Sequence, residues 1–149
     1  MDVPRVIAIT NEKGGVSKST TTANLGAALA TAGARVLLVD LDPHAGLTFS
    51  LGFDEPEGVF EKTVYDVLDP DAQLGLRQAA VPTKTNIRGL ELVPSHEDLV
   101  EIDYRLAGRT GWPQFLKRRI RDVGNAYQYV LIDCPPSLGI LTRMALVEE

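Results

Sequence analysis

Three short apolar runs limit the folds open to this chain. They are RVIAIT (residues 5–10), RVLLVD (residues 35–40) and YVLID (residues 129–133), all rich in β-branched residues and without an alternating polar side. Continuous apolar runs of this length suit strands that are covered on both faces, as in a parallel sheet. Two of the runs end in an aspartate, at Asp40 and Asp133. The sequence therefore predicts buried parallel strands with acidic carboxyl ends.

Helical patterns alternate with these runs. Residues 17–32 are rich in Ala, Thr and Leu and end at Gly33, which predicts a helix between the first two strands. A fourth short strand is predicted at residues 89–93. Four further helices are predicted at residues 63–68, after a capping box that begins at Ser95, from Pro113 onward and after Ser137. This alternation predicts an α/β fold with a doubly wound, mostly parallel sheet.

Size, charge and cysteine content narrow the class of protein. The 149 residues are enough for one domain with a single core. The net charge of −5 argues against a chain that binds nucleic acid over its whole surface, although a local basic patch stays open. The single cysteine, Cys134, excludes an intrachain disulfide. With no secretory leader and no long apolar run, we expect a cytoplasmic protein without a membrane anchor.

The segment ITNEKGGVSKSTTTANLG, residues 9–26, joins the first strand to the first helix. Glycines at such a turn let the backbone approach an anion bound at the helix N-terminus. Aligned on the phosphate-loop pattern G-x-x-x-x-G-K-[ST], Lys18 and Ser19 fit, whereas Glu12 and Ser17 replace the two glycines. The ordinary motif is therefore broken twice, and a second lysine, Lys13, stands in front of it.

What remains, KGGVSKST from Lys13 to Thr20, resembles the deviant Walker A loop of the ParA/MinD family of ATPases. VDLDP at residues 39–43 is similar to the switch I segment of that family, and YVLIDCPPSLG at residues 129–139 is similar to its Walker B and switch II segment. DLDP, TVYDVL, VPS and DCPPSLG are typical of the ParA/Soj partition proteins. The resemblance spans nearly the whole chain. It implies a P-loop NTPase fold that stops after the helix following Walker B, so that residues 1–149 form a single ATPase domain incomplete at its C-terminal end.

The resemblance also implies cofactors and residue roles. ATP and Mg²⁺ are the expected cofactors, and Lys13, Lys18 and Asp42 the expected catalytic residues. Asp42 would position the attacking water, and Lys13 would reach into the site of a partner subunit when two molecules sandwich two ATPs. The expected metal ligands are Ser19, Asp40 and Asp133. The expected nucleotide-binding residues are Lys13, Gly14, Gly15, Val16, Ser17, Lys18, Ser19 and Thr20.

The family likeness further implies partners and leaves alternatives. We expect an ATP-dependent homodimer, a ParB-like partner, no membrane, and a cytoplasmic location with nucleoid association as a variant. Non-specific DNA binding is expected of full-length relatives and less so of this chain, because much of their basic surface and adenine pocket would follow residue 149. The incomplete sheet would expose a strand edge, from which we expect self-association without nucleotide. A catalytically impaired, truncated interaction module and a MinD-like positioning ATPase are the alternatives.

Three features depart from the family pattern or have two interpretations. His44 stands where partition proteins commonly continue with glutamine, and a loop residue is favoured over a catalytic histidine. Cys134 is interpreted as a packed residue and not as a nucleophile, since nothing nearby would activate a thiolate. The basic cluster from Lys117 to Arg121 could touch DNA phosphates, but a solvated helix face is the favoured interpretation.

Overall fold

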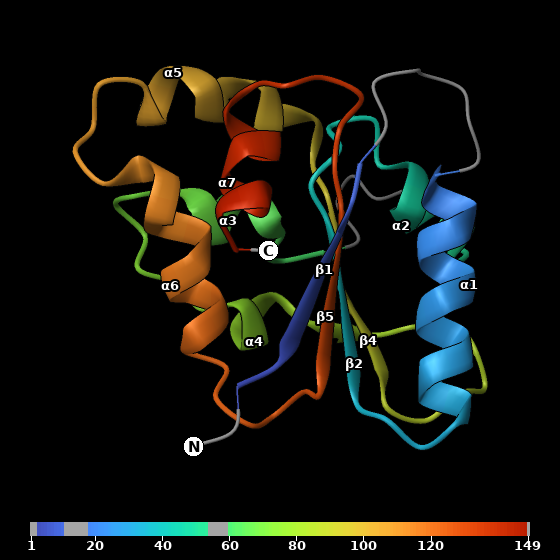
Figure 1. The fold of residues 1–149 in the computed structure, drawn as a ribbon. Helices are drawn as coiled ribbons and strands as arrows, with labels where there is room; N and C mark the ends of the chain where they lie inside the picture. The colour runs from blue at the N-terminus through green and yellow to red at the C-terminus, as the bar shows by residue number, and fades with distance from the viewer. Residues whose placement is uncertain (1–2, 11–17, 54–59, 149) are drawn as a thin grey trace.

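Four parallel strands form the centre of the molecule (Figure 1). The computed structural model describes residues 3–10, 18–53 and 60–148. Within these residues, a five-stranded sheet has the order β1-β5-β2-β4-β3. The parallel strands are β1 (Arg5–Ile9), β5 (Tyr129–Asp133), β2 (Val36–Asp40) and β4 (Leu90–Val93), and the short β3 (Val81–Pro82) pairs antiparallel to β4. The predicted doubly wound, mostly parallel α/β sheet is confirmed.

Helices cover both faces of this sheet (Figure 1). One face carries α1 (Lys18–Thr31) and the short α2 (Gly46–Ser50). The other face carries α3 (Val64–Leu68), α4 (Leu76–Ala79), α5 (Ile102–Leu106), α6 (Phe115–Arg121) and α7 (Ile140–Glu148). Two 3-10 turns, η1 (Glu97–Glu101) and η2 (Trp112–Gln114), lead into α5 and α6. The arrangement has three layers, helix, sheet and helix.

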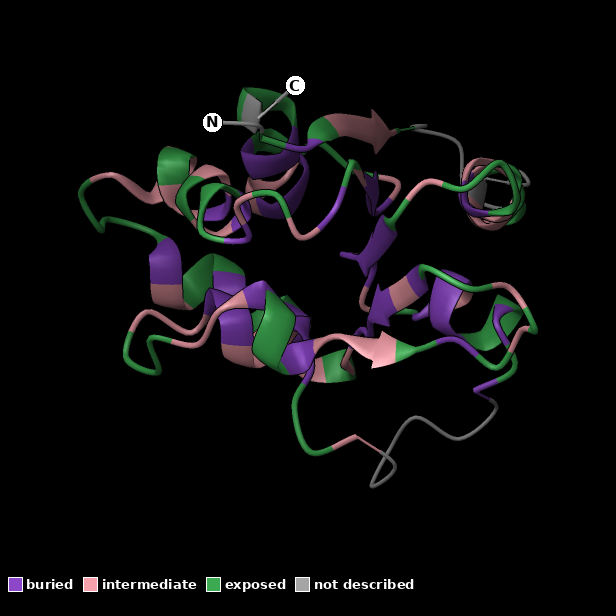
Figure 2. Cartoon of the chain, turned by 90° about the horizontal axis from the view of Figure 1, so that it is seen from below, coloured by how far each residue is buried: buried purple, intermediate pink, exposed green. Residues whose placement is uncertain are grey.

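The central strands contribute to two separate cores because successive side chains of a strand point to opposite faces. On β2, Leu37 and Val39 belong to the core under α3 to α7, whereas Val36 and Leu38 belong to the core under α1 and α2. Every residue of β2 is buried. Figure 2 shows the buried residues gathered on the inner strands and on the helix sides that face them. The unbroken apolar runs of β2 and β5 thus follow from burial on both faces. The predicted burial of the first run is wrong, because β1 lies at the edge of the sheet, where Arg5 is exposed and the other residues are half-buried.

The helix N-termini predicted from the sequence are correct at some positions and wrong at others. Thr63 caps α3 with a capping box completed by Asp66, and this helix lies at the predicted residues. The capping box predicted to begin at Ser95 is wrong, because the side chain of His96 accepts the hydrogen bond from Asp98 N at 3.0 Å. Neither α2 nor β3 was predicted. Both are short, at five and two residues, and neither has a periodic apolar pattern of its own.

Gly26 allows α1 to lie close to the sheet. A Cβ atom at this position would lie 2.7 Å from Leu38 Cδ2 and 3.3 Å from Leu90 Cδ1. Leu38 is fully buried on β2, so its side chain has little room to move aside. Close packing therefore outweighs the weak helix-forming tendency of a glycine in the middle of α1.

We predict that Gly26→Ala lowers the free energy of unfolding by about 1–3 kcal/mol, the usual cost of overfilling a packed core. Helix propensity alone predicts the opposite sign, a gain of about 1 kcal/mol. Urea unfolding of the variant and wild type measures the difference. Gly75→Ala controls for the steric effect alone, because its Cβ would meet only Gln78 Oε1 at an ordinary 3.5 Å, although Gly75 is the N-cap of α4 and not a helix-interior residue. A Gly26→Ala protein as stable as wild type would contradict the packing account.

Candidate functional site

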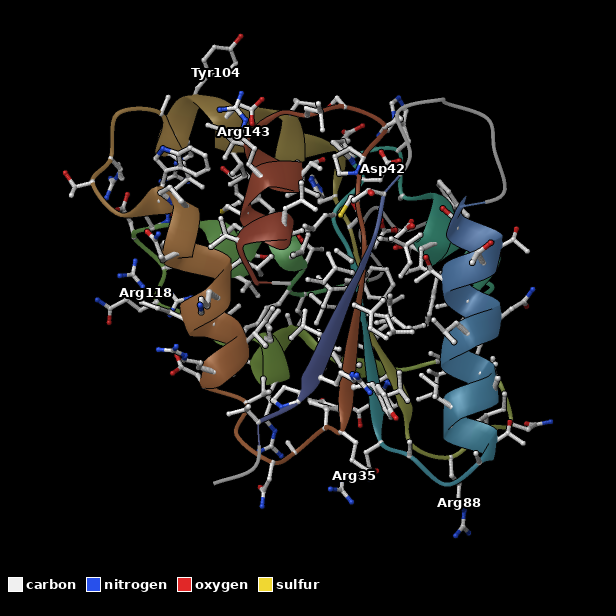
Figure 3. The ribbon with its side chains drawn as sticks, viewed as in Figure 1. Arg35, Asp42, Arg88, Tyr104, Arg118 and Arg143 are labelled. Carbon is white, nitrogen blue, oxygen red and sulfur yellow. The ribbon has the colours of Figure 1, made fainter. Side chains whose placement is uncertain are left out.

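Two aspartates meet at the carboxyl edge of the sheet. Asp40 ends β2, Asp133 ends β5, and the two are paired in the strand register. The ladder continues one residue further, since Leu41 N donates to Asp133 O at 2.9 Å. Both carboxyl side chains are completely buried. The carboxyl edge of an open α/β sheet is where ligands bind, and Figure 3 shows Asp42 at this same edge.

The Asp133 carboxylate is joined to the first turns of α1. Ser19 Oγ donates to Asp133 Oδ2 at 2.9 Å, and Thr22 Oγ1 donates to Asp133 Oδ1 at 3.1 Å. Ser19 and Thr22 are three residues apart, so both hydroxyls lie on the face of α1 that meets the sheet. Gly46 at the start of α2 also lies against this point, since a Cβ there would be 2.9 Å from Ser19 Oγ. The result is a cluster of oxygen atoms between α1, α2 and β5.

The Asp40 carboxylate organises the loop that follows β2. Its Oδ1 accepts from Asp42 N at 3.1 Å, and its Oδ2 accepts from Thr48 N at 2.9 Å and from Thr48 Oγ1 at 2.7 Å. Burial raises the pKa of Asp40 to about 7, with a smaller contribution from the charge of Asp133, although the hydrogen bonds from Thr48 and Asp42 act in the opposite direction. Asp40 therefore ties both ends of the loop to the end of β2.

Asp42 is held within that loop by both its backbone and its side chain. Ser95, two residues after the end of β4, donates through its Oγ to Asp42 O at 2.5 Å. The carboxylate Oδ1 of Asp42 accepts from His44 N at 3.0 Å and lies 3.2 Å from His44 Nδ1. The His44 side chain is 88% exposed, whereas that of Asp42 is 12% exposed. The loop is turned by Ala45, which has the left-handed φ of 59°.

The structure brings four of the predicted site residues to one edge: Ser19, Asp40, Asp42 and Asp133. Thr20 lies exposed in the first turn of α1. Lys13, Gly14, Gly15, Val16 and Ser17 lie outside the described residues, as does the side chain of Lys18. Cys134 is fully buried next to this edge, as expected of a packed residue.

The sequence interpretation missed Thr22, Thr48 and Ser95, which hold the two buried carboxylates and the loop. Thr22 could have been found from its spacing of three residues from Ser19 on a helix. Thr48 and Ser95 carry no such local signal, because Thr48 bonds to Asp40 at the end of β2 and Ser95 bonds to Asp42 and Thr48, contacts that are set by the fold.

Two features are absent from the described part of the chain. Among these residues, no three His, Cys, Asp or Glu side chains converge as a metal-binding group would. No helix in the described ranges has the length and apolar character needed to cross a membrane.

Comparison with known proteins gives the family. The family model AAA_31, described as an AAA domain, matches residues 4–149. The chain belongs to this family. Its AAA domain is 42% identical over 142 residues to the sporulation initiation inhibitor protein Soj of Bacillus subtilis, covering 95% of this chain and 54% of Soj. It is 44% identical over 148 residues to the chromosome partitioning protein ParA of Caulobacter vibrioides, covering 95% of this chain and 52% of ParA.

A solved structure has the same fold as this chain. The structure of cobyrinic acid a,c-diamide synthase from Mycobacterium smegmatis with a bound ATP analogue and magnesium has a TM-score of 0.89 and 44% identity. It covers 98% of this chain, which covers 57% of that protein. The predicted likeness to ParA and Soj is thus confirmed, and the chain spans about half the length of the curated relatives it matches.

We predict that Asp40→Asn gains stability relative to wild type as the pH rises from about 4 to about 8. The folded-state pKa is raised, so the folded protein holds the Asp40 proton more tightly than the unfolded chain and loses that stabilisation as the pH passes about 7. The pH-dependent difference should be on the order of 4 kcal/mol. Urea unfolding of both proteins in metal-free, nucleotide-free buffer measures it. Two parallel pH curves would contradict the raised pKa.

Proposed function

We propose that this AAA domain binds ATP with Mg²⁺ at the carboxyl edge of β5 and β2 and hydrolyses the ATP. The observation that carries the proposal is the bond between Ser19 on the first turn of α1 and the buried carboxylate of Asp133. This places a hydroxyl of the KGGVSKST segment beside a strand-end aspartate. Such a hydroxyl and carboxylate hold Mg²⁺ in P-loop NTPases.

The residues at this edge fit a magnesium ion. The Ser19 hydroxyl and the Asp133 carboxylate offer only oxygen atoms, which Mg²⁺ prefers. Mg²⁺ usually takes one or two protein ligands and completes its shell with water and substrate phosphates, so a group of three acidic side chains is not required. When bound, the ion would neutralise charge on the ATP phosphates. Thr22 would keep Asp133 oriented by its hydrogen bond.

Asp42 is the residue that we propose to position the attacking water. It is the least buried of the three aspartates at this edge, and its carbonyl and amide are both fixed, by Ser95 and by Asp40. Asp40 was predicted as a metal ligand and that role stays a prediction. Both of its oxygen atoms accept hydrogen bonds from the protein, which supports instead a role in positioning Asp42.

The two lysines of KGGVSKST are proposed to have separate roles. Lys18 would bind the phosphates of its own nucleotide. Lys13 would reach the nucleotide of a second subunit in an ATP-dependent homodimer, where a positive charge supplied in trans offsets charge that develops during phosphoryl transfer. The backbone amides from Gly14 to Thr20 would surround the phosphates at the head of α1.

The biological role that we propose is a ParA-type switch in plasmid or chromosome partitioning. The relatives at 42–44% identity, Soj and the chromosome partitioning protein ParA, support it. In this role the protein would cycle between nucleotide states in the cytoplasm or on the nucleoid, with a ParB-like partner that stimulates hydrolysis. A MinD-like positioning role would require membrane binding and is the second choice.

We predict that Lys18→Ala weakens binding of a fluorescent ATP analogue by about 100-fold, because a charge-assisted contact to phosphate is lost. Lys13→Ala should leave this affinity within about threefold while reducing ATP-dependent dimerisation and hydrolysis. Asp42→Ala should also retain binding, and its hydrolysis rate should fall by about 10²- to 10⁴-fold. Fluorescence titration, light scattering and phosphate release measure the three effects.

Lys62→Ala is the matched control, since it removes one exposed lysine far along the chain from the KGGVSKST segment. It should behave as wild type in all three assays. Equal loss of binding in Lys13→Ala and Lys18→Ala would contradict the separate roles. Equal ATP turnover by wild type and Lys18→Ala would contradict the proposed ATPase activity. It would favour the alternative of a catalytically impaired module that only interacts with other proteins.

A further inference from the structure

A second candidate site lies on α6, on the face of the sheet opposite to α1 (Figure 1). The helix and the turn after α3 form an open groove of about 430 Å³. The lining residues are Pro70, Gln73, Phe115, Arg118, Arg119, Arg121 and Asp122. Three of these seven residues carry a guanidinium group and one carries a carboxylate, so the charge of the groove is positive. The chain as a whole has a net charge of −5. Figure 3 shows Arg118 extending from α6 away from the sheet.

Neighbouring acidic residues do not neutralise this groove. Asp69 and Asp71, in the turn that forms its other wall, pair with arginines of α5 and the residues after it. Arg105 Nη2 lies 2.9 Å from Asp69 Oδ1 and 3.0 Å from Asp71 Oδ2, and Arg109 Nη2 lies 3.5 Å from Asp71 Oδ1. Within the described residues, no ion pair involves an arginine of α6. The positive charge of the groove therefore stays available to a ligand.

Phe115 holds two of the guanidinium groups in place. The guanidinium carbon of Arg119 lies 4.8 Å from the centre of the Phe115 ring, and that of Arg118 lies 5.9 Å from it. Arg119 is fixed further, because its Nε donates to Val67 O at 3.3 Å. Ordering these long side chains in advance reduces the entropy that binding would cost. An arginine stacked in this way keeps terminal N–H groups that suit two oxygen atoms of a phosphate.

We propose that the α6 groove binds a small anion that carries two or more phosphate groups. The volume of the groove lies within the range of small-molecule sites and is far from that of an extended surface. Nucleic acid is the less suitable occupant, because its backbone needs basic residues spread along a face, whereas these arginines converge on one hollow of an acidic chain. The groove is a different site from the carboxyl edge, so this proposal does not depend on the proposed ATPase activity.

The test is titration of the 149-residue chain with inorganic tripolyphosphate, in magnesium-free buffer with EDTA. Calorimetry gives the affinity, and ¹⁵N NMR gives the residues whose signals shift. We expect saturable binding at α6 in Lys18→Ala, in which the proposed nucleotide site is weakened, with shifts confined to α6 and residues 69–73. Wild type should show the same shifts and the same affinity at α6, alongside any binding at the proposed nucleotide site. Arg118→Ala and Arg121→Ala should each weaken binding by about tenfold or more, the usual effect of losing a charged hydrogen bond.

Lys117→Ala is the matched control, because it removes one positive charge from the same helix without changing the lining of the groove. At physiological salt it should weaken binding by less than about threefold, because Lys117 does not line the groove and charge that makes no direct contact with the ligand is screened. If Lys117→Ala loses as much affinity for tripolyphosphate as Arg118→Ala does, the proposal is overturned. Such a result would indicate that the anion is attracted to the positive charge of α6 in general. It would also be overturned by the absence of saturable binding at millimolar tripolyphosphate, by loss of all binding in Lys18→Ala, or by duplex DNA that binds to α6 without competition from tripolyphosphate.

Discussion

The buried carboxylate of Asp133 joins the sheet to the helix on which the proposed phosphate site depends. It sits at the end of β5, between β1 and β2, and accepts hydrogen bonds from Ser19 and Thr22 of α1. A buried carboxylate is costly unless polar groups satisfy it, so these hydroxyls are both its stabilising partners and the means by which α1 is aligned. The first turn of α1 is thereby fixed beside the strand that would provide the acidic ligand.

A second buried carboxylate, Asp40, fixes the loop on the other side of the site. Its three hydrogen bonds hold the amide of Asp42 and Thr48 of α2, and Ser95, just after β4, holds the carbonyl of Asp42. When two carboxyl groups are buried side by side, the negative charge of one makes ionisation of the other less favourable. The charge of Asp133 is therefore part of the reason that the pKa of Asp40 is raised, after burial itself. A bound cation would reduce the repulsion between the Asp40 and Asp133 carboxylates at the carboxyl edge of the sheet. This supports a metal-dependent site.

The sequence was sufficient for the parts of the fold that repeat a strong local pattern. The apolar runs of β2 and β5 are continuous because both faces are buried, whereas β1, at the edge of the sheet, is only half-buried. The placement of Asp40 and Asp133 at one edge follows from parallel strands. The partners of these acids were harder to predict. Thr48 and Ser95 belong to the site only because the chain folds back on itself across 8 and 53 residues, respectively. The α6 arginines were interpreted as a solvated face because no sequence pattern shows a hollow formed with the turn after α3.

The most direct test of the site at the carboxyl edge is the effect of Mg²⁺ on the affinity for an ATP analogue, in wild type and in Ser19→Ala. Ser19 Oγ is 2.9 Å from Asp133 Oδ2, so this substitution removes the one hydroxyl that we place next to both the metal and the phosphates. We predict that Mg²⁺ strengthens analogue binding by about tenfold or more in wild type, a contribution typical of a charged contact, and by much less in Ser19→Ala. Equal strengthening in the two proteins, or none in wild type, would contradict the account.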